Sequence, residues 1–258
     1  KAVTLSYGDG VIYDRKLIEI LDKYGLKCTF NINSGLFGAY RERLTKEEAL
    51  ELYANSPHEV AAHGARHLSL AYVDESVANY DVISDRVNLE NMFGRIIKGM
   101  AYANGSFNDK VVEILRRCGI NYARTVISTG KFDLPADWLR FNPTCHHKDP
   151  RLMEYVKEFL GIEKKYNTLP KLFCLWGHSY EFNNDDNWPV IEEFAKEVSG
   201  REDIWYATNG EIYDYVKAFN CLVFSGDGTM VYNPTFTDLY INCCGREIKV
   251  SAGQTVKV

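Results

Sequence analysis

No hydrophobic run in this sequence approaches the roughly 18 residues that a membrane-spanning helix needs, so we expect no membrane span. No signal peptide is recognisable either, and a chain that opens on Lys1 and a strand is compatible with an N-terminus that has been trimmed. Basic charge is also scarce: 30 lysines and arginines face 35 aspartates and glutamates, which gives a net charge of −5. This acidic balance gives no support for nucleic-acid binding.

The cysteines lack any regular spacing. There are seven, an odd number without a CxxC pair, and the adjacent Cys243 and Cys244 cannot readily bond each other. The pattern indicates a reduced compartment, or one free thiol outside the cell. We therefore expect a cytoplasmic rather than a secreted protein.

Internal repeats and low-complexity linkers are absent, and what is present is an alternation of strand-like and helical segments. Strand-like runs occur at residues 2–7, 27–32, 58–62, 98–101, 122–126, 171–176 and 204–207, and helical spacing occurs at residues 12–24, 46–55, 74–95, 108–118, 150–161, 188–198 and 209–219. The alternation predicts a parallel sheet with helical crossovers, either a β/α barrel or a doubly wound open sheet. No GxGxxG follows the first strand, so the best sequence marker of a dinucleotide-binding sheet is absent.

The pattern changes at Asn220. Residues 220–258 consist of short strand-like runs and Gly, Asn and Pro turns, without helical spacing. A stretch of about 39 residues is short for an independent domain. We therefore predict an α/β domain over residues 1–219 and a C-terminal β appendage packed on it over residues 220–258.

The stretch VTLSYGDG, residues 3–10, holds the first candidate for chemistry. It predicts a short buried strand that delivers the carboxylate of Asp9 into a glycine-rich turn. Asp9 is either a metal ligand or a turn-stabilising aspartate before Gly10. In β/α barrels the strand ends and the loops after them build the active site, which favours the ligand.

Two histidines, His63 and His67, lie four residues apart directly after the strand predicted at residues 58–62. On one helical turn this spacing puts both imidazoles on the same face, where they can bind one divalent ion. The residues between them are Gly, Ala and Arg, so the zinc-protease motif HExxH is absent. Alone, the pair is also compatible with a structural role. With Asp9 it forms a set that leaves positions open for water and substrate, as catalytic sites do.

A third strand end carries His178, within LFCLWGHSYEF at residues 172–182. Because an apolar run precedes it, we expect its ring at the same end of the sheet as Asp9. A histidine near the metal but not on it suits a general acid that protonates a leaving group. A buried core histidine is the alternative.

Taken together, TLSYGDG, HGARH and LFCLWGH resemble the first, second and fifth motifs of the polysaccharide deacetylase family of carbohydrate esterases, the NodB-like homology domain. The order and spacing of the motifs match over about residues 1–219. The resemblance implies a distorted (β/α)7-type barrel and metal-dependent removal of acetyl groups from N- or O-acetylated carbohydrate. It implies that Asp9, His63 and His67 hold one divalent ion, and that His178 is the catalytic acid. Zinc suits these ligands best, and cobalt, nickel or manganese would also be accepted.

Gly8 departs from the family pattern, in which the first motif holds two consecutive aspartates. The second aspartate is the ligand, here Asp9, and the first is the general base that activates water, whose position here is Gly8. Either the natural protein has lost or moved this function, or the sequence was altered. We expect a protein that binds metal and substrate but turns over slowly, because loss of a general base costs about 10²–10⁴-fold in rate.

The third motif is altered too. MAYANGSFND, residues 100–109, replaces the family's Arg-Pro-Pro-Tyr-Gly stretch, with Ala101 at the arginine that usually braces the base. The backbone N–H of Asn104 would still help to hold the oxyanion, since a backbone donor survives substitution.

The resemblance also suggests substrate contacts around the fourth and fifth motifs. Trp138 is the candidate wall of the acetyl pocket, and Leu175 its floor. Trp176 could stack on a sugar, although it is also compatible with the core. His146 and His147 could border the site or lie in a solvated loop.

Three functions stay open at this point. The first is a metal-dependent carbohydrate deacetylase weakened at Gly8, and the second is a non-catalytic carbohydrate-binding pseudoenzyme. The third is a hydrolase of non-sugar amides, such as cyclic ureides, on the same fold. The aromatic-rich loops favour an acetylated sugar or oligosaccharide as the partner, and no feature indicates an oligomeric state.

Overall fold

The computed structural model describes residues 1–258 except 41, 164 and 166–168. The chain divides into two compact units, the larger formed by residues 1–161 and 170–210 and the smaller by residues 162–169 and 211–258. The predicted boundary between residues 219 and 220 stays a prediction. No helix among the described residues is long and apolar enough to cross a membrane.

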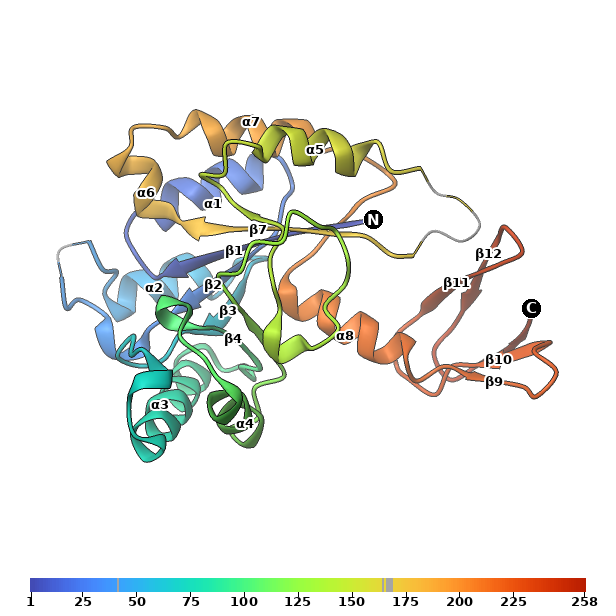
Figure 1. Cartoon of the computed structure of the whole chain (residues 1–258), viewed down its shortest axis with the longest axis horizontal. Coiled ribbons are helices and arrows are strands. Elements are labelled where there is room, and N and C mark those ends of the chain that lie inside the picture. The colour runs from blue at the N-terminus through green and yellow to red at the C-terminus, as the bar shows by residue number, and fades with distance from the viewer. Residues whose placement is uncertain (41, 164, 166–168) are drawn as a thin grey trace. The chain divides into compact units, whose positions relative to one another are not determined.

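A parallel sheet forms the centre of the larger unit (Figure 1). Its strands are β1 (Ala2–Asp9), β2 (Cys28–Ile32), β3 (Glu59–Ala62), β4 (Gly99–Ala101), β5 (Tyr122–Arg124), β6 (Cys145–His146), β7 (Leu172–His178) and β8 (Trp205–Tyr206). They are ordered β5-β4-β3-β2-β1-β7-β6, and β8 also pairs with β1. The central strand β1 is buried almost throughout, which explains why its sequence is apolar rather than alternating.

The sheet curls into a distorted barrel, because one segment bonds to both of its edges. Phe141 donates its N–H to Ala123 and accepts one from Thr125, and these two residues lie in β5 or directly after it. A few residues later, Cys145 in β6 pairs with Leu175 in β7. The predicted (β/α)7-type barrel is therefore confirmed.

The helices that follow the strands pack outside the sheet. They are α1 (Asp14–Lys23), α2 (Lys46–Tyr53), α3 (Glu75–Phe93), α4 (Asp109–Arg117), α5 (Leu152–Leu160), α6 (Ser179–Asn184) and α7 (Pro189–Val198). Helix α8 (Asn209–Phe219) begins at the end of the larger unit, and most of its residues belong to the smaller one. Helices α1, α5, α6 and α7 lie together on one side of the sheet, and α3 and α4 lie together on another (Figure 1). Four 3₁₀ turns complete the unit, at Ser34–Leu36, Leu70–Tyr72, Ala103–Gly105 and Trp138–Arg140.

Two elements were not expected from the sequence. Strand β6 is two residues long, too short to show a period of two. Helix α6 begins at Ser179, directly after β7 ends at His178, so no turn residue separates the two patterns.

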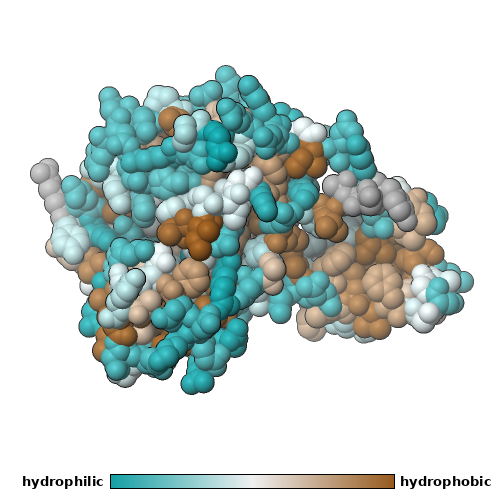
Figure 2. Space-filling view, in the orientation of Figure 1, coloured by the Kyte–Doolittle hydropathy of each residue, from teal (hydrophilic) through white to brown (hydrophobic). Residues whose placement is uncertain are grey.

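The smaller unit consists mainly of β-structure, as predicted for the C-terminal residues. Strands β9 (Val223–Phe224), β10 (Met230–Tyr232) and β13 (Thr255–Lys257) form an antiparallel sheet, and β11 (Leu239–Cys243) and β12 (Arg246–Val250) form a hairpin. Its buried core is small, with Val231, Ile241 and Val250 at its centre. Several apolar side chains stay exposed, and Figure 2 shows hydrophobic residues gathered on its surface.

Candidate active site

The carboxyl end of β1 lies between β2 and β7 and delivers two site positions. Gly8 pairs in register with Asn31 of β2 and with His178 of β7, and Asp9 follows as the last residue of the strand. Parallel strands end at the same edge of a sheet, so Asp9 and His178 arrive together without any helix to position them.

His63 and His67 lie in a tight turn after β3, and the helical turn expected from their spacing is wrong. His67 donates its backbone N–H to the carbonyl of Gly64, and Asn33 donates its side-chain amide to the carbonyls of His63 and Gly64. Gly64 has φ of +77°, and a Cβ there would lie 2.7 Å from Oδ2 of Asp81. The turn therefore requires glycine at this position, and it brings the two histidines together without a helix.

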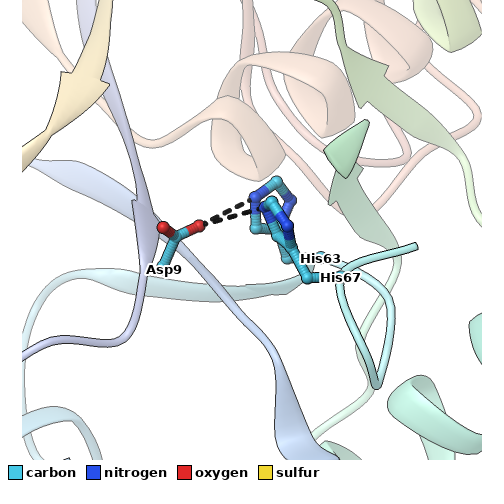
Figure 3. A group of neighbouring side chains, drawn as sticks. All are labelled: Asp9, His63 and His67. Carbon is cyan, nitrogen blue, oxygen red and sulfur yellow. Dashed lines mark ion pairs between the residues drawn. The ribbon is translucent and has the colours of Figure 1, made fainter. Parts of the chain in front are cut away.

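The side chains of Asp9, His63 and His67 converge on one point (Figure 3). Oδ1 of Asp9 lies 3.1 Å from Nε2 of His63 and 3.5 Å from Nε2 of His67. These separations match the distance of about 3.3 Å between ligand atoms around a tetrahedral zinc ion with bonds of 2.0–2.1 Å. The Asp9 oxygen is buried and has no well-aligned hydrogen-bond donor among the described residues, as expected of an atom that binds a cation.

The protonation of the site also fits a metal. Nδ1 of His63 lies 2.8 Å from the carbonyl oxygen of Ala101, which can only accept, so Nδ1 carries a proton and Nε2 is the ring nitrogen that faces Asp9. Burial and the charge of His63 lower the pKa of His67 to about 4, so its ring is neutral at neutral pH. Burial alone would raise the pKa of Asp9, but His63, His178 and Arg43 lower it well below its usual range. An ionised carboxylate and a neutral imidazole are forms that bind divalent ions.

A part-buried arginine and a buried aspartate brace these three side chains. Arg43 donates to the backbone carbonyl of Asp9 and to the side chain of Asn33, and its Nη2 lies 3.9 Å from Oδ2 of Asp9. Asp85 of α3 accepts the backbone N–H of His63 at 2.8 Å and that of Ser34 at 2.7 Å. The ligand loops are thus tied to each other and to α3.

His178 belongs to a second polar cluster beside the metal ligands. Its Nδ1 lies 3.1 Å from Oε2 of Glu181, and Nε2 of His146 lies 3.1 Å from the same oxygen. His147 is buried, with its Nε2 3.6 Å from Oε2 of Glu181 and its Nδ1 3.2 Å from the hydroxyl of Tyr7. The two expected border histidines therefore lie next to His178, His146 part-exposed and His147 in the core.

Gly8 faces both groups of side chains. A Cβ at Gly8 would lie 3.4 Å from Nε2 of His63, and 3.3 Å and 3.7 Å from Cδ2 and Nε2 of His178. A side chain at this position would therefore enter the space between His63 and His178. That position 8 is the place of a general base stays a prediction.

The expected substrate-contact residues do not all lie at this place. Trp176 is part-exposed on the same face of β7 as His178, and its ring packs against His146 with centroids 4.5 Å apart. Leu175 is fully buried, and strand alternation puts it on the opposite face, so it does not join them as a pocket floor.

Asn104 and Trp138 lie in 3₁₀ turns of the larger unit. Asn104 follows β4 with φ of +55°, and its side chain bonds to Ser69. Trp138 begins the turn Trp138–Arg140 and packs on Phe141. Their roles toward an acetyl group stay predictions.

Sequence reasoning missed Arg43, Asp85 and Glu181. Asp85 and Asp81 lie four residues apart on the same face of α3 as buried apolar residues, a signal of buried acids that could have been noticed. Glu181 lies three residues after His178, the spacing of a helix capping box. No local pattern marks Arg43, which reaches the site from an irregular loop.

Comparisons with known proteins agree with this geometry. Residues 1–123 match the sequence model of the family described as polysaccharide deacetylase. No curated protein matches the sequence.

Solved structures share the fold at low identity. A Mycobacterium smegmatis protein named as a polysaccharide deacetylase is 16% identical with a TM-score of 0.59, over 85% of this chain and 92% of that one. A CE4 family pseudoenzyme from Bacillus anthracis is 15% identical with a TM-score of 0.54, over 83% of this chain and 66% of that one. The structure of a mutant of that protein with restored enzymatic activity has also been solved. The Streptococcus pyogenes deacetylase PplD is 22% identical with a TM-score of 0.49, over 55% of this chain and 62% of that one.

The chain thus spans less than two thirds of the length of two of these proteins. Residues 1–123 are thus similar to the polysaccharide deacetylase family, and the chain shares its fold with the Mycobacterium smegmatis protein.

Proposed function

We propose that this protein is a metal-dependent hydrolase that removes acetyl groups from N- or O-acetylated carbohydrate, and that glycine at position 8 weakens it. The observation that carries the proposal is the convergence of Asp9, His63 and His67 around a buried carboxylate oxygen to which no described residue gives a well-aligned hydrogen bond. A divalent ion, most simply zinc, would be held by these three side chains. When bound, it would polarise the acyl carbonyl and lower the pKa of water.

The surrounding residues support the remaining steps. Ala101 fixes the ring of His63 through its carbonyl, and Arg43 holds the strand end at Asp9. His178 lies on the other side of the Gly8 position, where it can protonate the nitrogen or oxygen that leaves. Trp176 is part-exposed beside it and offers an aromatic face to a sugar ring.

The test is Gly8→Asp, with Gly8→Asn as the matched control of nearly equal size that lacks a basic carboxylate. The backbone at Gly8 is not in the left-handed region, and the closest approach of a Cβ is 3.3 Å, so the new side chain needs shifts of only a few tenths of an ångström. Zinc-loaded protein should release acetate about 10²–10⁴-fold faster after Gly8→Asp than after Gly8→Asn. Acetate would be measured on a panel of N- and O-acetylated oligosaccharides, with cyclic ureides as the non-sugar arm.

Two results would contradict the proposal. One is a protein that binds no stoichiometric zinc although it is folded. The other is a Gly8→Asp variant that binds zinc but releases acetate no faster than Gly8→Asn on every acetylated sugar.

A non-catalytic carbohydrate-binding role is the second candidate, and Gly8 itself favours it. The fold is shared with the Bacillus anthracis protein described as a CE4 family pseudoenzyme. In that case the unaltered chain should bind acetylated oligosaccharides, measured by calorimetry, while it releases no acetate above the metal-free blank.

A further inference from the structure

The polar cluster around Glu181 fixes where the imidazoles of His146 and His178 carry their protons. The backbone N–H of Lys148 donates to Nδ1 of His146 at 3.1 Å, so the neutral ring of His146 is protonated at Nε2. That N–H faces Oε2 of Glu181 at 3.1 Å. Because both ring nitrogens of His146 are thereby assigned to hydrogen bonds, we regard this cluster as a hydrogen-bond network and not as a second metal site.

Glu181 is an acceptor on both carboxylate oxygens. Oε2 accepts the backbone N–H of His178 at 3.0 Å and faces Nδ1 of the same residue at 3.1 Å. Nζ of Lys148 lies 3.2 Å from Oε1. Burial alone would raise the pKa of Glu181, but His146 and His178 lower it well below the usual range, so the group is ionised and cannot donate. The proton shared with His178 therefore lies on Nδ1 of the imidazole.

When the ring of His178 is neutral, its lone pair is therefore on Nε2, at the side of Gly8. Nε2 of His178 and Nε2 of His63 lie 3.7 Å and 3.4 Å from the same point, the position that a Cβ at Gly8 would take. Because Gly8 has no side chain, it places no atom between His178 and the three expected metal ligands. A water molecule that bonds to Nε2 of His178 would lie a few tenths of an ångström closer to it than this point does.

We infer that in the chain with glycine at position 8 His178 is both the general base and the general acid, with Glu181 as the residue that positions it. The inference rests on the proposed function and explains how hydrolysis proceeds without the aspartate. Nε2 of His178 takes one proton from the attacking water while the water oxygen bonds to the acyl carbon. The same proton passes from Nε2 to the leaving nitrogen or oxygen as its bond to the acyl carbon breaks, and acetic acid is released and loses its proton to solvent. One histidine thus cycles its proton without any further reactant.

An activated ester separates the two roles of His178. The leaving group of 4-nitrophenyl acetate departs without protonation, so a histidine that acts only as an acid is dispensable with this substrate. In the unaltered, zinc-loaded chain His178→Gln should lower hydrolysis about 10²-fold or more, because the base is lost. In the Gly8→Asp background the same substitution should cost less than about 10-fold, since the new carboxylate is then the base. Metal-free samples of each variant give the background to be subtracted.

A second measurement does not depend on turnover. Nitrogen-15 NMR of the metal-free protein should show His178 neutral with its proton on Nδ1, and Glu181→Gln should shift the ring toward the Nε2–H form. Glu181→Gln should also slow the unaltered chain, whereas Glu192→Gln, which changes an exposed glutamate paired with Lys23, should not.

The inference is overturned if His178→Gln leaves 4-nitrophenyl acetate hydrolysis by the unaltered chain unchanged, if that chain has no metal-dependent hydrolysis at all, or if the free ring is protonated on Nε2. In each case a Gly8→Asp variant that still releases acetate from acetylated sugar would keep the proposed function intact. Loss of zinc binding or of all acetate release after Gly8→Asp would instead remove the proposed function.

Discussion

Asp14 offers a prediction about stability and pH at a residue that ties two site loops together. It is the first residue of α1 and is fully buried. Its Oδ2 accepts the hydroxyl of Tyr53 at 2.6 Å and the backbone N–H of Val11 at 3.2 Å, and its Oδ1 accepts the hydroxyl of Ser179. Val11 follows the Asp9 turn and Ser179 follows His178, so this carboxyl group joins the two strand ends from behind.

Burial raises the pKa of Asp14 from 3.8 to about 6, although its three hydrogen bonds lower it in part. A rise of roughly 2 pKa units at 1.36 kcal/mol each corresponds to about 3 kcal/mol. Because the folded state binds the proton more tightly than the unfolded chain, this contribution to stability is fully present below about pH 4. It is lost as the pH rises through about 6.

The perturbation is Asp14→Asn, which keeps the shape but does not titrate. The amide oxygen can accept from Val11 and Tyr53, and the amide nitrogen can donate to Ser179 once its hydroxyl rotates. The free energy of unfolding of metal-free protein would be measured in urea from pH 4 to pH 7.5. The unaltered protein should lose about 3 kcal/mol relative to the variant across this range. A constant difference between the two proteins would refute the reasoning.

Three further predictions concern zinc binding, the turn at Gly64 and the start of α2. Zinc at 100 times its Kd should stabilise the protein by about 2.7 kcal/mol, seen as a rise in Tm that EDTA reverses, and a rise that survives His67→Ala would contradict the site. Gly64→Ala should destabilise the fold by about 3 kcal/mol and weaken zinc binding in calorimetry, because the new Cβ would meet the side chain of Asp81. The control is Gly94→Ala, which also lies at positive φ but has open space around it; it should cost only about 1–2 kcal/mol and leave the zinc affinity unchanged. Thr45→Ala removes a capping box from α2 and should lower the free energy of unfolding in urea by about 1 kcal/mol. The zinc affinity should stay the same.

The alternation of apolar strands and amphipathic helices was sufficient to predict a parallel sheet with helical crossovers, because each segment's periodicity is a local property of the chain. Helix α1, for example, lies within the helical spacing predicted at residues 12–24 and buries Leu17, Ile20 and Leu21. Elements too short to show a period, such as β6, were invisible for the same reason. The barrel itself was implied only by the resemblance to the deacetylase family. The hydrogen bonds that curl the sheet join residues of β5 to Phe141 and residues of β6 to β7. The sequence of one strand does not show which other strand it pairs with, so these bonds could not be predicted.

The sequence by itself determined the strand ends at which Asp9, His63 and His178 stand, and it showed that position 8 carries no base. It did so because parallel strands all end at one edge of a sheet, whatever the loops do. Only the tertiary structure decided that His63 and His67 meet through a glycine turn, that Arg43 and Asp85 brace the ligands, and that Glu181 sets the tautomer of His178. These contacts join residues from different loops and helices, and their protonation follows from burial and neighbouring charge, which exist only after the chain has folded.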